Sequence, residues 1–117
     1  MRQAGILATA GLIALEQMPE RLPLDHANAK LLAQGLASID GITADAAKVQ
    51  TNIVVIDVSG VGMSPAEISS LAKQRGLLFN AIGPRQMRLV THFDVSRADC
   101  ETALDIIAGI VKVPARK

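Results

Sequence analysis

Apolar positions follow two different periods along the chain, and these periods predict most of its secondary structure. Residues 3–18 are mostly apolar and are followed by Pro19, which predicts a helix that ends there. Because its apolar side chains cover almost the whole circumference, this helix is expected to be buried on several sides. A second helix is predicted over residues 25–38, after a short connection between Pro19 and Pro23 and with Asp25 as its N-cap. Its apolar face would be formed by Leu24, Ala27, Leu31, Leu32 and Leu36.

The second half of the chain reads as short strands and two capped helices. Residues 53–58 are mostly β-branched and predict a buried strand, and residues 77–80 and 87–91 predict two more strands around a turn at Gly83 and Pro84. Ser64 and Glu67 have the spacing of a capping box and begin a helix that runs to about Arg75. Ser96 caps a last helix, which continues to about Val111.

This order of elements predicts an α+β fold for one domain that covers residues 1–117. We expect a small antiparallel or mixed sheet of about three strands with helices packed on it, plus the N-terminal helix. The chain is too short for a two-domain enzyme.

Composition excludes several classes of protein. Aromatic residues make up only 2% of the chain and the net charge is +1, so nucleic-acid binding has no support. The most apolar stretch, residues 4–15, is shorter than the roughly 20 residues of a membrane helix, so no membrane partner is expected. The single Cys100 permits no internal disulfide, fits a reducing cytoplasm, and is interpreted as a helix residue without a chemical role. No side chains have metal-ligand spacing.

Three stretches, residues 1–7, 49–54 and 88–96, resemble in this order the C-terminal third of low-specificity L-threonine aldolases. This family belongs to the aspartate-aminotransferase-like enzymes of fold type I, which use pyridoxal 5'-phosphate (PLP). The resemblance covers essentially the whole chain and implies the small C-terminal domain of such an enzyme. Family members carry a further region before this point, so Met1 looks like an internal methionine. We therefore expect a truncated gene, a misplaced start codon or a cloned fragment.

The resemblance also implies a reaction, the cleavage of L-threonine or L-allo-threonine to glycine and acetaldehyde. In the family the Schiff-base lysine, its acid partner and the stacking histidine lie in the preceding region. None of the five lysines here matches the context of the cofactor lysine, namely Lys30, Lys48, Lys73, Lys112 and Lys117. We therefore expect no catalytic residue in this chain, and no bound PLP or activity when it is alone. The alternative is a non-catalytic oligomerising or small-molecule-binding α+β module.

Two arginines are the candidate site residues that the resemblance implies. The arginine that matches Arg88 holds the α-carboxylate of the substrate, and a planar guanidinium suits that task because it pairs with both oxygens. A surface or structural ion pair is the other interpretation of Arg88. The arginine that matches Arg2 reaches the cofactor phosphate, and only in the full-length assembly. Arg85 is interpreted as an exposed turn residue that adds positive potential at most.

The remaining expectations concern two histidines and the assembly. His26 is interpreted as a structural residue near a helix terminus, and His92 as a hydrogen-bonding residue that organises a loop. The apolar first helix predicts a homo-oligomer, most simply a two-fold dimer, unless the helix folds back onto its own sheet. The residues expected between chains lie around Ile6, Leu7, Ala10, Ile13 and Ala14.

Overall fold

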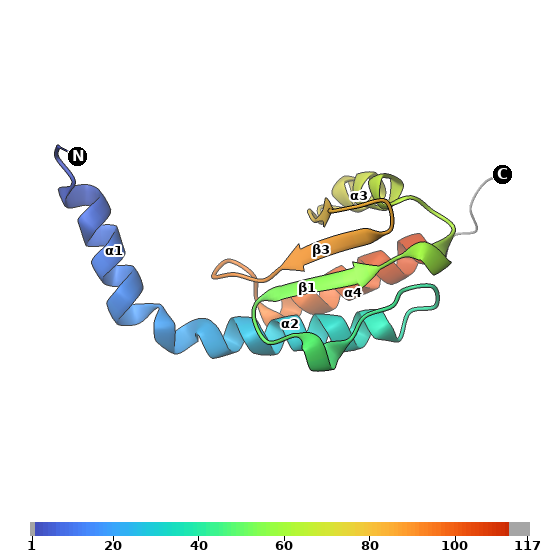
Figure 1. Cartoon of the computed structure of the whole chain (residues 1–117), viewed down its shortest axis with the longest axis horizontal. Helices are drawn as coiled ribbons and strands as arrows, with labels where there is room; N and C mark the ends of the chain where they lie inside the picture. The colour runs from blue at the N-terminus through green and yellow to red at the C-terminus, as the bar shows by residue number, and fades with distance from the viewer. Residues whose placement is uncertain (1, 113–117) are drawn as a thin grey trace.

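The computed structural model describes residues 2–112 and has an α+β architecture, as the sequence predicts (Figure 1). Its helices are α1 (Gly5–Gln17), α2 (Leu22–Ala37), α3 (Pro65–Gln74) and α4 (Arg97–Val111). Its strands are β1 (Ile53–Asp57), β2 (Asn80–Ala81) and β3 (Gln86–Val90). Short 3-10 turns occupy Pro19–Arg21, Ala46–Lys48 and Ser59–Val61.

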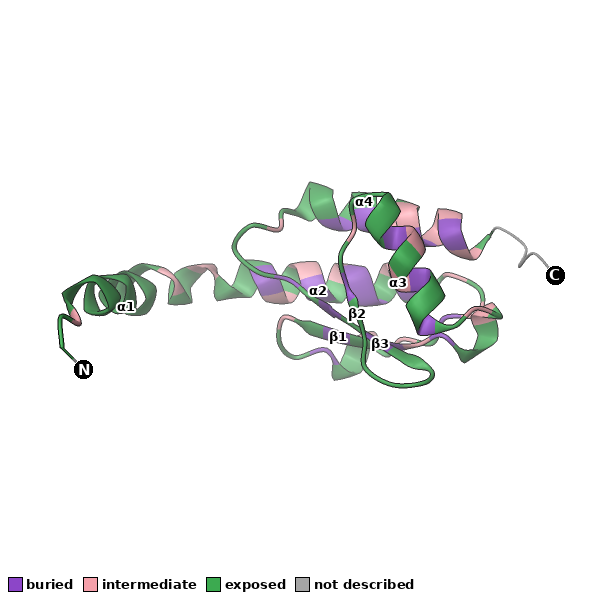
Figure 2. Ribbon diagram, turned by 90° about the horizontal axis from the view of Figure 1, so that it is seen from above, coloured by how far each residue is buried: buried purple, intermediate pink, exposed green. Residues whose placement is uncertain are grey.

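The three strands form one antiparallel sheet in the order β1-β3-β2. Helices α2 and α4 pack against each other beneath the sheet, and α3 packs on α4 and β2, so the helices cover a single face (Figures 1 and 2). Alternate strand residues point into this layer and are buried, as the period of a strand requires. The sheet and helices α2, α3 and α4 share this core, which includes Leu32, Leu36, Val54, Ile56, Ile68, Met87, Leu89, Ile107 and Ile110.

Helix α1 projects away from this layered body (Figure 1). It has no buried residue, and Ile6 and Leu15 are 86% and 77% exposed. The alternative in which the first helix folds back onto its own sheet is therefore wrong. The helix also begins two residues later than predicted, because Gln3 has a φ of 56°, which no α-helix accommodates.

The start of α2 differs from the prediction. The helix begins at Leu22, and Pro23 lies in its first turn instead of in the connection. A proline fits there because its ring fixes a helical φ and its missing N–H would have had no partner. Asp25 is thus no N-cap but a buried residue inside the helix, and the buried face is shifted to Ala29, Leu32, Ala33 and Leu36. Leu24 and Ala27, predicted on the apolar face, are exposed.

The second half of the chain follows the predictions closely. Both capping boxes are present, Ser64 with Glu67 at α3 and Ser96 with Asp99 at α4. The strand predicted over residues 77–80 is the exception, because only Asn80 and Ala81 pair with β3 and the segment before them runs unpaired.

The two capping boxes are expected to make the stability of the fold depend on acidic pH. Ser64 and Ser96 donate from their backbone N–H and hydroxyl groups to Glu67 and Asp99, and these hydrogen bonds hold the pKa of both carboxyls below their ordinary values. A lowered pKa in the folded state means that the stabilisation exists while the carboxylates are ionised, and is lost as the pH falls through the range in which they take up protons.

We therefore expect the Glu67→Gln, Asp99→Asn double variant to show a shallower loss of stability below pH 5 than the wild type. Urea denaturation at a series of pH values measures this. Glu101→Gln is the control, because Glu101 is an exposed residue of α4 outside the capping box. Identical pH profiles for the wild type and the double variant would contradict the prediction.

Candidate functional site

Arg88 lies at the centre of the sheet face that the helices leave bare. It is the third residue of β3, the middle strand, and its neighbours Met87 and Leu89 point into the core. The alternation of a strand therefore directs Arg88 outward, and the side chain is exposed. Its partners across the ladder are Val55 on β1 and Asn80 on β2.

The surroundings of Arg88 on this face are mostly apolar. Ile53, Val55 and Val90 are each 43–45% exposed, and Ile82 at the end of β2 is 44% exposed. Together with Arg88, Asn80 and Gln86 these residues are called the outer face below. A charged group in the middle of half-exposed aliphatic side chains is unusual for a surface that only meets water, because such side chains are stabilised by burial.

Arg88 has no acidic partner within the described residues. The ion pairs found over residues 2–112 are Arg21–Asp25, Lys48–Asp45 and Arg97–Glu101. The carboxylate on the neighbouring strand, Asp57, accepts hydrogen bonds from the backbone N–H and the hydroxyl of Ser59. These bonds, with a smaller effect of Arg85, hold the pKa of Asp57 below its ordinary value. The interpretation of Arg88 as half of an ion pair is therefore wrong for this part of the chain.

A charged junction connects the end of β3 to the start of α2. Arg21 donates to both carboxylate oxygens of Asp25, at 2.9 and 3.2 Å, and its guanidinium carbon lies 4.8 Å from the ring centroid of Phe93. Thr91, which directly follows β3, donates its hydroxyl to the backbone carbonyl of Asp25 at 2.8 Å. Thr91 and Asp25 are 0% and 3% exposed. The junction therefore fixes where α2 begins relative to the strand that carries Arg88.

The other predicted residues lie apart from Arg88. Arg2 is exposed at the far end of α1, and Arg85 is exposed in the turn between β2 and β3 (Figure 1). His26 is half-buried near the start of α2. His92 accepts a hydrogen bond at Nδ1 from the backbone N–H of Asp94 at 3.3 Å, which confirms that it organises a loop. Cys100 is buried in α4, and burial, with smaller effects of Asp99 and Glu101, raises the pKa of its thiol.

The residues present do not fit a covalently bound PLP. The Schiff base of that cofactor needs a lysine beside an enclosed site. Lys30, Lys48, Lys73 and Lys112 are exposed, and none is on a strand of the sheet that carries Arg88. Lys117 and Met1 lie outside the described residues. No group of residues between positions 2 and 112 has the arrangement of a metal site, and no helix there is long and apolar enough to cross a membrane.

Sequence reasoning found Arg88 but missed two features around it. The first is Asn80, whose position beside Arg88 depends on the strand register and leaves no trace in the local sequence. The second is the junction of Arg21, Asp25 and Phe93. Opposite charges four residues apart, as in Arg21 and Asp25, are a recognisable helix signal and would have placed the helix start before Asp25.

Comparison with known proteins identifies a matching family model and several threonine aldolases that this chain is similar to. The family model of beta-eliminating lyases matches residues 1–59. Low-specificity L-threonine aldolase 1 of Arabidopsis thaliana is 32% identical over 105 residues, which are 89% of this chain and 29% of the relative. The low specificity L-threonine aldolase of Escherichia coli (strain K12) is 40% identical over 97 residues, 83% of this chain and 27% of the relative. The chain thus spans less than a third of the length of these relatives.

A solved structure shares the fold. The structure of MppP soaked with the product 2-ketoarginine superposes with a TM-score of 0.67 over 86% of this chain and 30% of that protein. Because only 10% of the residues are identical, this likeness supports the fold alone.

The junction predicts a large loss of stability when one of its charges is removed. Arg21→Met leaves the carboxylate of Asp25 buried without a partner, which costs about 3–5 kcal/mol in buried pairs. Arg21 keeps 20% of its side chain exposed, so we expect about 2–3 kcal/mol from urea denaturation. The Arg21→Met, Asp25→Asn double variant should recover part of this loss. Arg97→Met is the matched control, because its pair with Glu101 is largely exposed and is worth about 0–1 kcal/mol. Equal effects of the two single variants would contradict the role of the junction.

Proposed function

This chain belongs to the beta-eliminating lyase family, and from that membership we propose that it forms the substrate-facing C-terminal part of a threonine aldolase. The parent enzyme would cleave the Cα–Cβ bond of L-threonine or L-allo-threonine, with PLP as the group that accepts the electrons of the broken bond. The identity of 32–40% to low-specificity L-threonine aldolases over most of the chain supports this assignment. The chain would supply no Schiff-base lysine, so alone it would not catalyse the reaction.

In this proposal Arg88 binds the α-carboxylate of the amino acid. The observation that carries the proposal is a guanidinium without an acidic partner in the described part, at the centre of an uncovered sheet face. A guanidinium donates two parallel hydrogen bonds to a carboxylate and so fixes the orientation of the amino acid. The aliphatic side chains around it would exclude water once the remaining part of the enzyme covers the outer face, and an ion pair is stronger where water is excluded.

Asn80 is the natural second group of this site. It is the cross-strand partner of Arg88 in β2, and directly opposite residues of an antiparallel pair have Cβ atoms about 4.5–5.5 Å apart. Its amide group both donates and accepts, so it would help to orient either the guanidinium or the substrate. Arg2 would contribute to phosphate binding only in an assembly that brings α1 to a cofactor site.

The assembly is the second element of the proposal. Helix α1 exposes Ile6, Leu7, Leu12, Ile13 and Leu15 by 47–86% each, and no residue of this helix is buried. Water-exposed apolar surface of this kind is uncommon in soluble monomers and marks interaction surfaces. We infer that α1 packs against α1 of a second copy, or against the remaining part of the enzyme. A chain that only assembles, without belonging to an active enzyme, is the alternative function that this surface favours.

The Arg88 assignment is tested in a chimera in which this chain replaces the matching 97-residue segment of the Escherichia coli K12 relative. We expect Arg88→Ala to lower kcat/KM for L-threonine by about 2–5 kcal/mol of transition-state binding, mainly through a raised KM. The kcat/KM of Arg88→Lys should lie between those of the wild type and Arg88→Ala, because lysine keeps the positive charge but lacks the planar guanidinium that donates two parallel hydrogen bonds. The visible absorbance of bound PLP should not change in either variant.

Arg85→Ala is the matched control for charge, since Arg85 is an exposed arginine of the same hairpin. An unchanged kcat/KM in Arg88→Ala would remove Arg88 from the site. A chimera that binds PLP but turns over no threonine before any mutation would instead favour the purely assembling module.

The assembly is tested on the chain itself. We expect sedimentation velocity at micromolar concentration to show a dimer or larger species, and the Leu7→Glu, Ile13→Glu double variant to shift it to the monomer, because a charge in an apolar contact is costly to bury. Leu78→Glu is the control, as an exposed leucine outside α1. A wild-type monomer with an intact α1 helix would disprove self-association through α1.

A further inference from the structure

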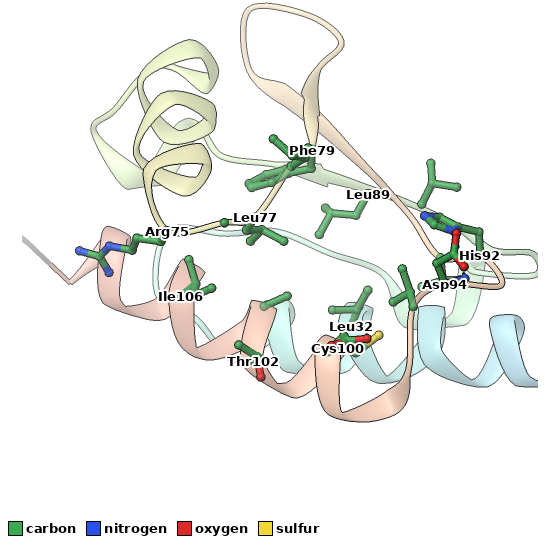
Figure 3. Close-up of a pocket in the computed structure, with 17 residues that line it drawn as sticks. Leu32, Arg75, Leu77, Phe79, Leu89, His92, Asp94, Cys100, Thr102 and Ile106 are labelled. Carbon is green, nitrogen blue, oxygen red and sulfur yellow. Dashed lines mark hydrogen bonds between the residues drawn. The ribbon is translucent and has the colours of Figure 1, made fainter.

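A cavity of about 450 Å³ lies on the side of the sheet opposite to Arg88, and the proposed function does not use it. Its walls are the segment 75–79, which is the turn after α3 and the residues that lead into β2, then the end of β3 with residues 91–95, and one side of α4 (Figure 3). The volume falls within the range of small-ligand sites in proteins. Arg88 is not among the lining residues.

The cavity forms because two neighbouring strands diverge. Asn80 pairs with Arg88, and the same register would place Leu78 opposite Val90. Between these two residues the described structure has no backbone hydrogen bond, and both line the cavity instead. The ladder between β2 and β3 therefore ends at the cavity and leaves two extended backbones on either side of it.

The backbone N–H and C=O groups of Val90 and Leu78 have no hydrogen-bond partner within residues 2–112. Along β3, alternate residues direct their N–H and C=O groups to opposite neighbours. Thr91 bonds to Asn52 on the β1 side, and Gln86 accepts from Ile82 on the β2 side. Val90 therefore directs its N–H and C=O to the β2 side, where no hydrogen bond joins it to Leu78. An open pair of donor and acceptor next to a cavity is the feature that extended peptides recognise when they add to a sheet.

The inner wall of the cavity is apolar and its two ends carry opposite charges. Leu32, Leu77, Leu89, Ala103 and Ile106 provide the aliphatic surface. Arg75 lies at one end and Asp94 at the other (Figure 3). Neither residue takes part in an ion pair of the described chain. The Nη1 atom of Arg75 is 2.9 Å from the point where a side chain on Gly109 would begin, so the glycine lets the guanidinium lie directly on α4.

The separation of the two ends sets the length of the occupant. Asp99 at the start of α4 lines the Asp94 end, and Gly109 marks the Arg75 end. Ten residues of an α-helix span about 15 Å, at 1.5 Å each. An extended chain covers about 3.3–3.6 Å per residue, so about four residues bridge this distance.

We propose that this cavity binds a free apolar tetrapeptide in an extended conformation. The carboxylate of the peptide pairs with Arg75 and its ammonium group with Asp94, and this polarity fixes its direction. Its backbone bonds to the open groups of Val90 and Leu78, and its side chains pack on Ala103 and Ile106. The site is separate from Arg88, so it does not depend on the proposed aldolase function.

The test is a titration of the ¹⁵N-labelled chain with the peptide alanyl-valyl-alanyl-valine, followed by NMR. We expect saturable shifts of the amide signals of Leu78 and Val90. Acetylation of the peptide N-terminus should weaken binding to the wild type about three- to fivefold, as an exposed ion pair does, and should leave binding to Asp94→Asn unchanged. Amidation of the peptide C-terminus should likewise weaken binding to the wild type, and it should leave binding to Arg75→Gln unchanged.

Asp94 and Arg75 are both exposed, so these substitutions are expected to leave the fold intact, and unchanged spectra of the free variants verify this. Arg85→Gln is the charge control and should bind like the wild type. The proposal is overturned by shifts that do not saturate, by equal losses of affinity in Arg75→Gln and Arg85→Gln, or by shifts confined to outer-face residues other than Val90. If acetylation affects Asp94→Asn as strongly as the wild type, the proposed direction of the peptide is wrong.

Discussion

The sheet is covered by helices on one face only, and most of the surface chemistry of this chain follows from that constraint. Alternating residues of β1 and β3 fill the core between the sheet and α2 and α4, so the remaining residues of both strands have to face outward. Half of those outward residues are polar, namely Asp57, Gln86 and Arg88, as on a solvated antiparallel sheet. The other half, Ile53, Val55 and Val90, are aliphatic and lie around Arg88. The outer face thus presents exposed aliphatic side chains beside a guanidinium, a combination that suits a binding surface.

Local sequence patterns were sufficient where the structure is decided locally. The capping boxes at Ser64 and Ser96 are closed within four residues, and both helices begin where the sequence predicts. The prediction failed at Asp25 for the opposite reason. An aspartate before an apolar run is a good N-cap signal, but the partner of this carboxylate is Arg21. Phe93 and Thr91, which contact Arg21 and the Asp25 carbonyl, come from far along the chain. The segment before Asn80 was likewise predicted as a strand but is unpaired, because pairing depends on the neighbouring strand as well as on the local sequence.

The candidate site was predictable in part. An arginine inside an apolar strand stands out in the sequence, and the resemblance to threonine aldolases adds a role for it. Its lack of an acidic partner over residues 2–112, and its place between Val55 and Asn80, depend on register. The exposure of α1 was expected only in part. Composition indicated that the helix needs a partner, and the structure shows that no other part of the described chain provides one.

The two bare surfaces, α1 and the outer face, are connected through the junction of Arg21, Asp25, Thr91 and Phe93. Arg21 ends the turn that follows α1, and Thr91 lies three residues after Arg88 in the same strand and its extension. A bidentate ion pair, a cation–π contact and a buried hydroxyl hydrogen bond hold these segments together, and no glycine lies between Met18 and Asp25. Because ordering flexible segments on binding costs free energy, a partner that covers both surfaces is bound more tightly when their relative position is already set. The junction therefore contributes to the proposed assembly by fixing the start of α2, which follows α1, relative to the strand that carries Arg88.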